Sequence, residues 1–410
     1  MLVLLLLFFF AFPLLSTVVA ARKIRQWQYQ VVIFAFFMLG AYIIVPYDEG
    51  DIALYQVRMD HLRGVTGTQF FNEFVGGVAL SGISGLEIFF NLNVFLVSRF
   101  TTDVAVCYCV TAAVYFIAWR AIILTLLKIY DEHNKEERNF KALVFLVFFG
   151  IYVIFFRVIN GRFYLAYWVF AYAYYKIVAE RKLKYHWLLF STIFIHQAFL
   201  FLNILGVLFN LLKPVFRIKR AEYVLFVLII GGTIFSETGI AVVNDYLSRI
   251  GGDFEDHFSA YTTDHYIEGQ MERTRQWFVE LRTPLLFYSL VATLLFSRFK
   301  RAFDFDEKAH NMYFFILMLW AINAFTINVP SFGDRFRNIL MGLILMLLFY
   351  LFATNPRRPT TVLFYLTAAA FIFYKLVTIK MLEGYINTWL LYPFTVLLNH
   401  FSGPVPIGGS

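Results

Sequence analysis

Charged residues are scarce in this chain. Asp, Glu, Lys and Arg together make up 15% of the 410 residues, whereas hydrophobic residues make up 60% and aromatic residues 20%. The mean hydropathy of +0.68 corresponds to more apolar surface than the interior of a soluble domain of this length can hold. The shortage of charge therefore excludes a soluble globular protein and indicates an integral membrane protein.

Cysteine is scarcer still. Cys107 and Cys109 are the only two, and they lie in one apolar stretch. They cannot reach each other as a disulfide there, and they lack the partners of a metal site. We interpret both as packing residues, because a free cysteine behaves as a small hydrophobe.

Three catalytic motifs are also missing. The sequence has no Walker phosphate loop, no G-x-S-x-G nucleophile elbow and no H-E-x-x-H zinc motif. These absences argue against an ATPase, a lipase and a zinc protease.

Long apolar stretches are abundant instead. A transmembrane helix needs roughly 20 apolar residues. We predict an all-α polytopic integral membrane protein, a single transmembrane domain over residues 1–400 with about 11 to 12 transmembrane or re-entrant helices. Residues 401–410 are expected to be a disordered tail or a cloning remnant. The apolar stretches are residues 2–20, 30–46, 102–127, 142–156, 163–179, 186–212, 223–241, 284–297, 311–328, 336–353 and 361–378.

Basic residues gather in the turns between these stretches. The first stretch has none before it and Arg22, Lys23 and Arg25 after it, which predicts a retained span that starts outside and ends in the cytoplasm. The positive-inside rule places all such groups in the cytoplasm, so the formal net charge of +8 reflects membrane orientation and not nucleic-acid binding. The groups are residues 22–25, 128–141, 181–184, 213–220, 298–308 and 357–358.

Two segments must then return to the face from which they start. Residues 47–101 would begin and end outside, so their middle is expected to be a surface or re-entrant helix pair softened by glycines. Residues 186–212 would begin and end inside, yet their 27 residues make only about 40 Å of helix. We predict a bent or broken hairpin with His196 and Gln197 at its tip, beside a cavity.

Arginines on the outer side of this map work against the rule that sets the orientation. At membrane depth they are costly unless they face a cavity or a charged ligand, and the guanidinium fork suits phosphate. We therefore predict an anionic ligand at the outer leaflet. The alternative is that these arginines snorkel or pair with neighbouring carboxylates. The predicted substrate-binding residues are Arg58, Arg157, Asn160, Arg162, Asp334, Arg335 and Arg337.

Five short elements occur in order along the chain: DEGDIALY (48–55), NGR (160–162), a basic turn (181–184), FIHQAFLFL (194–202) and DRFR (334–337). Together they resemble the EpsG-like family of exopolysaccharide polymerases, the Wzy-like group. Gln197 stands where that family typically has a small residue. The resemblance implies a GT-C-like helical bundle in the bacterial inner membrane, with its active site facing the periplasm or outside.

The resemblance also implies the reaction. Such an enzyme joins oligosaccharide repeat units carried on undecaprenyl diphosphate into O-antigen, capsule or exopolysaccharide. Its partners would be the lipid-linked donor and acceptor, membrane lipid and, as a candidate, a chain-length regulator, with no cofactor. Fixed guanidinium groups can neutralise the diphosphate leaving group, so no metal is required.

An acceptor hydroxyl must lose a proton as it attacks. Asp51 is the first candidate for the base and His196 the second. Asp51 could instead cap a helix or belong, with Asp48 and Glu49, to a metal site. His196 could simply bond a neighbouring helix.

Three other functions stay open at this point. A flippase or transporter for lipid-linked oligosaccharides would show paired half-sequences or broken spans at matching positions, and the sequence has no clear internal repeat. A membrane O-acyltransferase would favour basic and His residues on the inner side. A GT-C polyprenyl-phosphate sugar transferase would also carry acidic residues in its first outer loop, so the sequence does not separate it from a polymerase.

Overall fold

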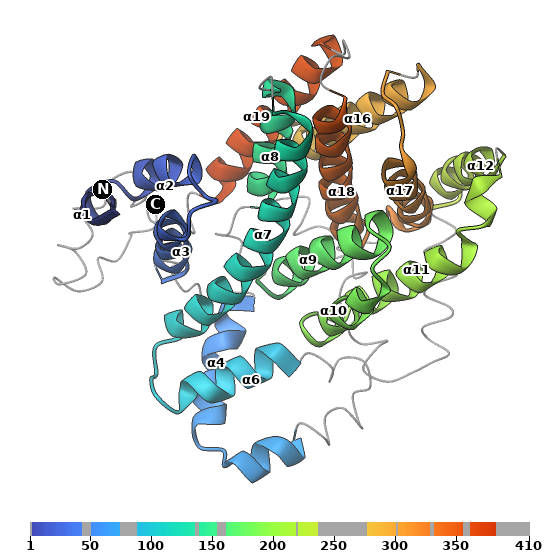
Figure 1. Cartoon of the computed structure of the whole chain (residues 1–410). Helices are drawn as coiled ribbons and strands as arrows, with labels where there is room; N and C mark the ends of the chain where they lie inside the picture. Colours follow the sequence, from blue (N-terminus) through green and yellow to red (C-terminus); the bar gives the residue numbers. More distant parts are fainter. Residues whose placement is uncertain are drawn as a thin grey trace.

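The structure is a computed structural model that describes residues 2–42, 51–73, 88–135, 139–153, 161–218, 220–236, 277–300, 302–328, 332–355 and 361–382. Within these residues all regular structure is helical, and no strand occurs. The predicted all-α class is therefore confirmed (Figure 1).

The first apolar stretch is divided into two helices. α1 (Leu2–Ala11) and α2 (Pro13–Ala21) are separated by Phe12, and Pro13 opens α2. A proline fits the first turn of a helix but cannot continue one from the preceding residue without losing a hydrogen bond. The single continuous span expected over residues 2–20 is thus replaced by two short helices, which pack against α3 (Trp27–Tyr42).

A small second core surrounds the next helices. α4 (Asp51–Arg63) packs on α6 (Ile88–Ser98), and α6 packs on the start of α7 (Ala105–His133). Tyr55 is buried between Phe90 and Tyr108, with ring centroids 4.3 Å and 5.2 Å away. Of the helix pair expected in the middle of residues 47–101, α6 is visible, while the glycine-rich part lies outside the described residues.

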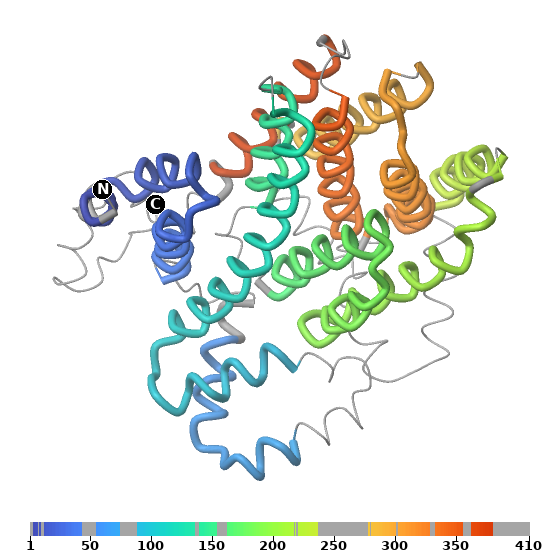
Figure 2. Tube along the Cα trace, viewed as in Figure 1, coloured from blue at the N-terminus to red at the C-terminus, as the bar shows by residue number. Residues whose placement is uncertain are grey.

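The main core lies around α18 (Phe332–Thr354). This helix packs against α7, α8 (Phe140–Tyr152), α16 (Trp277–Phe299) and α17 (Glu307–Thr326), and 89% of its apolar stretch is buried. A helix that is apolar on every side needs such a central position. Figure 2 shows the blue N-terminal helices on the left and the orange helices α16 to α18 on the right, with α7 between them.

Three of the described helices are long and apolar enough to cross a membrane. They are Ala105–His133, Gly333–Thr354 and Val362–Ile379 of α19 (Thr361–Leu382). Shorter apolar helices accompany them, among them α11 (Phe199–Leu212) and α12 (Ala221–Ile234). The composition and the helices together are those of a multi-pass membrane protein.

Residues 186–212 form the predicted broken hairpin. α10 (His186–Ser191) continues as a 3₁₀ turn (Thr192–Phe194), and α11 begins at Phe199. Nδ2 of Asn210 lies 3.1 Å from Nε2 of His186, and Nδ2 of Asn203 donates to the Thr192 hydroxyl at 3.2 Å. The chain therefore folds back on itself, and the break that turns it contains His196 and Gln197.

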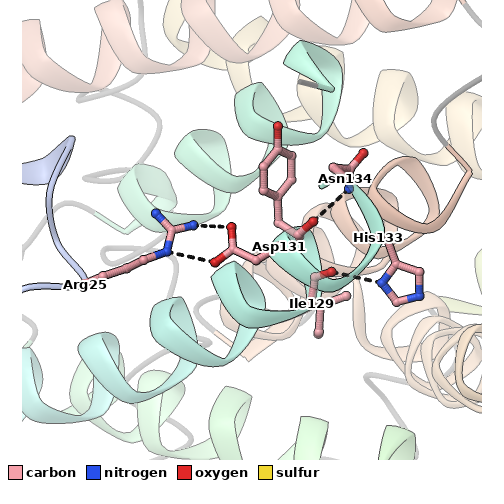
Figure 3. Close-up of polar contacts among 6 residues, drawn as sticks. Arg25, Ile129, Asp131, His133 and Asn134 are labelled. Carbon is pink, nitrogen blue, oxygen red and sulfur yellow. Dashed lines mark hydrogen bonds and ion pairs between the residues drawn. The ribbon is translucent and has the colours of Figure 1, made fainter. Parts of the chain in front are cut away.

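The predicted cytoplasmic turns meet at one end of the bundle. Nε of Arg25 donates to Oδ2 of Asp131 at 2.8 Å, which joins the turns at 22–25 and 128–141 (Figure 3). Arg181 forms an ion pair with Glu307, and Nη2 of Arg298 lies 3.0 Å from Glu222. Segments that the positive-inside rule assigned to one face thus contact one another.

Candidate functional site

The end of the bundle away from these turns contains three of the predicted arginines, Arg162, Arg335 and Arg337. We call it the arginine end, and it is formed where α8 ends at Tyr152, where α9 (Gly161–Tyr174) begins, where α18 begins and where the α10–α11 hairpin turns. The Tyr152 hydroxyl donates to Oδ1 of Asn338 at 3.3 Å, so the last turn of α8 lies beside the first turns of α18.

Phe163 is at the centre of this end. Its side chain is 4% exposed. The His196 ring meets it edge-on at 5.5 Å with an interplanar angle of 82°, and the guanidinium carbon of Arg335 lies 5.6 Å from its centroid. Two predicted site residues from distant parts of the sequence thus contact the same ring. No motif in the sequence marks Phe163 as a site residue.

The surroundings of His196 favour one tautomer. The residue is 8% exposed, and its Nδ1 accepts a hydrogen bond from the backbone N–H of Ala198 at 3.2 Å. A neutral imidazole whose Nδ1 accepts has its proton on Nε2. In this tautomer Nε2 is a donor, so the ring is suited to donating a hydrogen bond to a ligand oxygen and poorly suited to removing a proton.

Arg162 links this end to the second core. Its guanidinium carbon lies 4.9 Å from the Phe90 ring, and Phe90 in turn packs edge-on against Tyr55 of α4. Asp51 is the first residue of α4, and Arg58 is half-buried on the same helix. The spacing of Asp51, Tyr55 and Arg58 places them on one side of α4, the side from which Tyr55 reaches Phe90. The carboxyl group of Asp51 is outside the described part of the chain.

The two late arginines have different partners. Arg337 forms an ion pair with Asp334 three residues before it, and their side chains are 19% and 64% exposed respectively. Asp334 also lies in the first turn of α18, where a negative charge is favourable. Among the described residues Arg335 has no carboxylate partner and contacts the Phe163 ring. Pairing with a neighbouring carboxylate therefore explains Arg337 but leaves Arg335 as the better ligand-binding candidate.

Several predicted features lie outside the described residues. Arg157 and Asn160 precede the described part of α9, and Asp48 and Glu49 precede α4. Most of the long hydrophilic loop between α12 and α16 is outside as well. Within the described part of the chain, no group of three His, Cys, Asp or Glu side chains could hold a metal ion. The roles predicted for Arg157 and Asn160 stay predictions.

Comparison with known families decides the assignment. The EpsG family model matches residues 67–394, which is most of the chain. The chain belongs to the EpsG family. The predicted resemblance is confirmed, and EpsG-like proteins are polymerases of the Wzy type. No curated protein and no solved structure matches the chain.

The range that the EpsG family model matches divides the predicted site residues into two groups. Arg162, His196 and Arg335 lie inside residues 67–394, whereas Asp51 and Arg58 precede them. The Phe163 cluster therefore lies in the part of the chain that the EpsG family model matches, and α4 lies on the N-terminal side of that part. The contact from Arg162 through Phe90 to Tyr55 connects the two parts.

Proposed function

We propose that this EpsG-family protein is a membrane glycosyltransferase that polymerises undecaprenyl-diphosphate-linked oligosaccharide repeat units into surface polysaccharide. The reaction would take place at the outer face of the bacterial inner membrane. The observation that carries the proposal is the meeting of Arg335, Phe163 and His196 at the arginine end. A guanidinium group held against a buried ring and beside a donor imidazole is suited to binding a phosphate oxygen.

The chemistry assigned to this end is a displacement at the anomeric carbon of the donor. The acceptor hydroxyl oxygen forms a new bond to that carbon, and the bond from the carbon to the diphosphate oxygen breaks. The bonding electrons leave with the lipid diphosphate. Arg335 stabilises the charge that develops on this leaving group, as fixed donors do when they are oriented before the reaction, and His196 donates a hydrogen bond to a phosphate oxygen.

The proton of the acceptor hydroxyl needs a base. Asp51 is assigned this role, since the tautomer of His196 makes its ring a donor. The helix that begins at Asp51, α4, is connected to α9 through Tyr55, Phe90 and Arg162. The basic turns gather at the other end of the bundle, and by the positive-inside rule this supports an arginine end that faces outside.

Deletion of the chromosomal copy tests this function. Surface polysaccharide should lose its ladder on a gel while single repeat units still reach the outer carrier, and the wild-type gene should restore the ladder. An Arg335→Lys gene should restore little of the ladder, because lysine keeps the charge but loses the two-pronged geometry. Repeat units that accumulate on the cytoplasmic side of the deletion strain would support the rival flippase and contradict the polymerase.

A further inference from the structure

Lys375 is a charged residue within an apolar span. It lies in the Val362–Ile379 part of α19 and is only 7% exposed. An ionisable side chain at membrane depth is expensive, and such residues mark substrate or ion sites more often than they serve packing. None of the functions assigned above uses this ammonium group.

Lys375 lies at the arginine end. Its Nζ donates to the backbone carbonyl of Tyr152, the last residue of α8. The rings of Tyr152, Phe371 and Tyr374 surround it, with centroids 5.4 to 5.5 Å from Nζ. Aromatic faces stabilise a desolvated cation, so these rings favour a cationic side chain at this position.

The ammonium group lines a small pocket between α8, α9, α18 and α19. The polar lining is one cation, an amide and hydroxyl groups, with no carboxylate among the lining residues. The cavity volume is about 10 Å³, which is close to the space that one water-sized group occupies. A lining of this kind fits a single anionic oxygen and excludes a sugar ring. The lining residues are Tyr152, Val153, Tyr164, Asn338, Tyr374, Lys375 and Thr378.

The pocket adjoins the cluster around Phe163. Tyr164 directly follows Phe163 on α9, and Asn338 lies one turn after Arg335 on α18. Residues three apart on a helix are neighbours on one side of it. A diphosphate group bound at Arg335 would therefore have the Lys375 pocket on the same side of α18.

A structural role for Lys375 would be to cap the end of α8. The final carbonyls of a helix need donors, and Lys375 supplies one. The neighbouring carbonyls are capped by neutral groups, however. The Trp119 indole N–H donates to Gly150 at 2.9 Å, and the Tyr115 hydroxyl donates to Val153 at 2.9 Å. Capping at this helix end does not need a charge, so capping alone does not explain why the donor to Tyr152 is a lysine.

We propose that Lys375 is a second anion-binding residue, which holds a phosphate oxygen of the lipid diphosphate in the pocket beside Tyr164 and Asn338. This inference rests on the proposed function, because the lipid-linked substrate supplies the diphosphate. The donors of the pocket bind the oxygen, while the aromatic rings exclude water from it.

Binding of undecaprenyl diphosphate to the purified full-length protein in phosphatidylcholine nanodiscs tests the assignment. Lys375→Gln keeps a donor for the Tyr152 carbonyl but removes the charge, and it should weaken binding about tenfold or more. Trp119→Phe is the matched control for capping, since it loses the hydrogen bond to Gly150 and neither residue lines the pocket; its binding should match the wild type. Equal affinity of Lys375→Gln and the wild type would overturn the proposal.

Two further measurements cover the remaining outcomes. Tyr164→Phe removes only a hydroxyl of the pocket and should weaken binding several-fold, which keeps the test open if Lys375→Gln does not fold; unchanged binding of this variant would then contradict the assignment. Nanodiscs of phosphatidylglycerol separate the two sources of phosphate. Loss of the Lys375 dependence in these nanodiscs would assign the pocket to bulk lipid and overturn the substrate role. Failure of the wild type to extend repeat units would instead remove the proposed function.

Discussion

Replacement of Phe163 by leucine separates the contacts of its ring from simple packing. Leucine fills much of the same space, so the helices should still pack, with a smaller loss of stability than the about 3 to 5 kcal/mol typical of Phe→Ala. The variant loses two specific contacts, the edge-on contact with His196 and the contact with the Arg335 guanidinium group. We therefore expect activity to fall by more than stability does.

The magnitude follows from these two contacts. A buried cation–ring contact contributes up to ~2 kcal/mol, and an edge-on aromatic pair contributes ~0.5 to 1.5 kcal/mol. Together they amount to about 1 to 3 kcal/mol of positioning for Arg335 and His196. If that positioning is needed in the transition state, kcat/KM should fall roughly 5- to 150-fold.

The assay is chain extension by purified protein with lipid-linked repeat units, measured beside thermal stability. Phe170→Leu is the matched control, because Phe170 is equally buried two turns further along α9 and contacts Phe199 and Phe315. Phe170→Leu should lose stability without losing kcat/KM. Equal activity of both variants, within about twofold once stability is corrected, would refute a functional role for the Phe163 ring.

Four further predictions concern the charge, the base, the metal and the orientation. Arg335→Lys should lose most polymerisation while the protein accumulates, and Arg337→Lys should lose less because Asp334 already pairs with Arg337; the reverse order would contradict the assignment. Asp51→Asn should abolish the ladder with expression and lipid binding intact, whereas His196→Ala should give a milder loss, and a dead His196→Ala beside an active Asp51→Asn would make the histidine the base. Purified enzyme should extend chains in excess EDTA, and rescue by magnesium after chelation would instead indicate a metal site in the acidic stretch. Val57 and Leu183 are both exposed, so labelling of a cysteine at either position depends on the side of the membrane that it faces. In a background without Cys107 and Cys109, Val57→Cys on intact spheroplasts should label with an impermeant maleimide and Leu183→Cys should not; labelling of Leu183→Cys alone would invert the predicted orientation.

Chain length and charge were enough to predict the hairpin at residues 186–212. Basic turns at both ends required a return to the same face, and 27 residues are too few for two full spans. Only a break near the middle satisfies both conditions, and the structure has it at His196 and Gln197. The first apolar stretch was harder, because its composition is that of a span and the break depends on the single residue Pro13.

The centre of the candidate site could not be predicted in the same way. Phe163 is one of 51 phenylalanines, and nothing in its local sequence separates it from a packing residue. Its role depends on which residues of α18 and the hairpin lie against it, and that is decided by tertiary packing. The same holds for the arginines, since local sequence offers Asp334 as a partner to both Arg335 and Arg337, and only helix geometry selects Arg337.

Lys375 did carry a signal in the sequence. It is a charged residue inside the apolar stretch at 361–378, and the handful of charges within such stretches can be examined one by one. Its partners come from α8, α9 and α18, so its position beside the arginines became visible only with the fold.

Reconstitution of the purified protein with lipid-linked repeat units tests the central claim most directly. We predict that the wild-type protein alone converts single repeat units into a ladder of longer lipid-linked chains, and that the Arg335→Lys protein, prepared in the same way, forms little or none. Repeat units that stay single with the folded wild-type protein, or that only change sides of a sealed vesicle, would contradict the assignment as a polymerase.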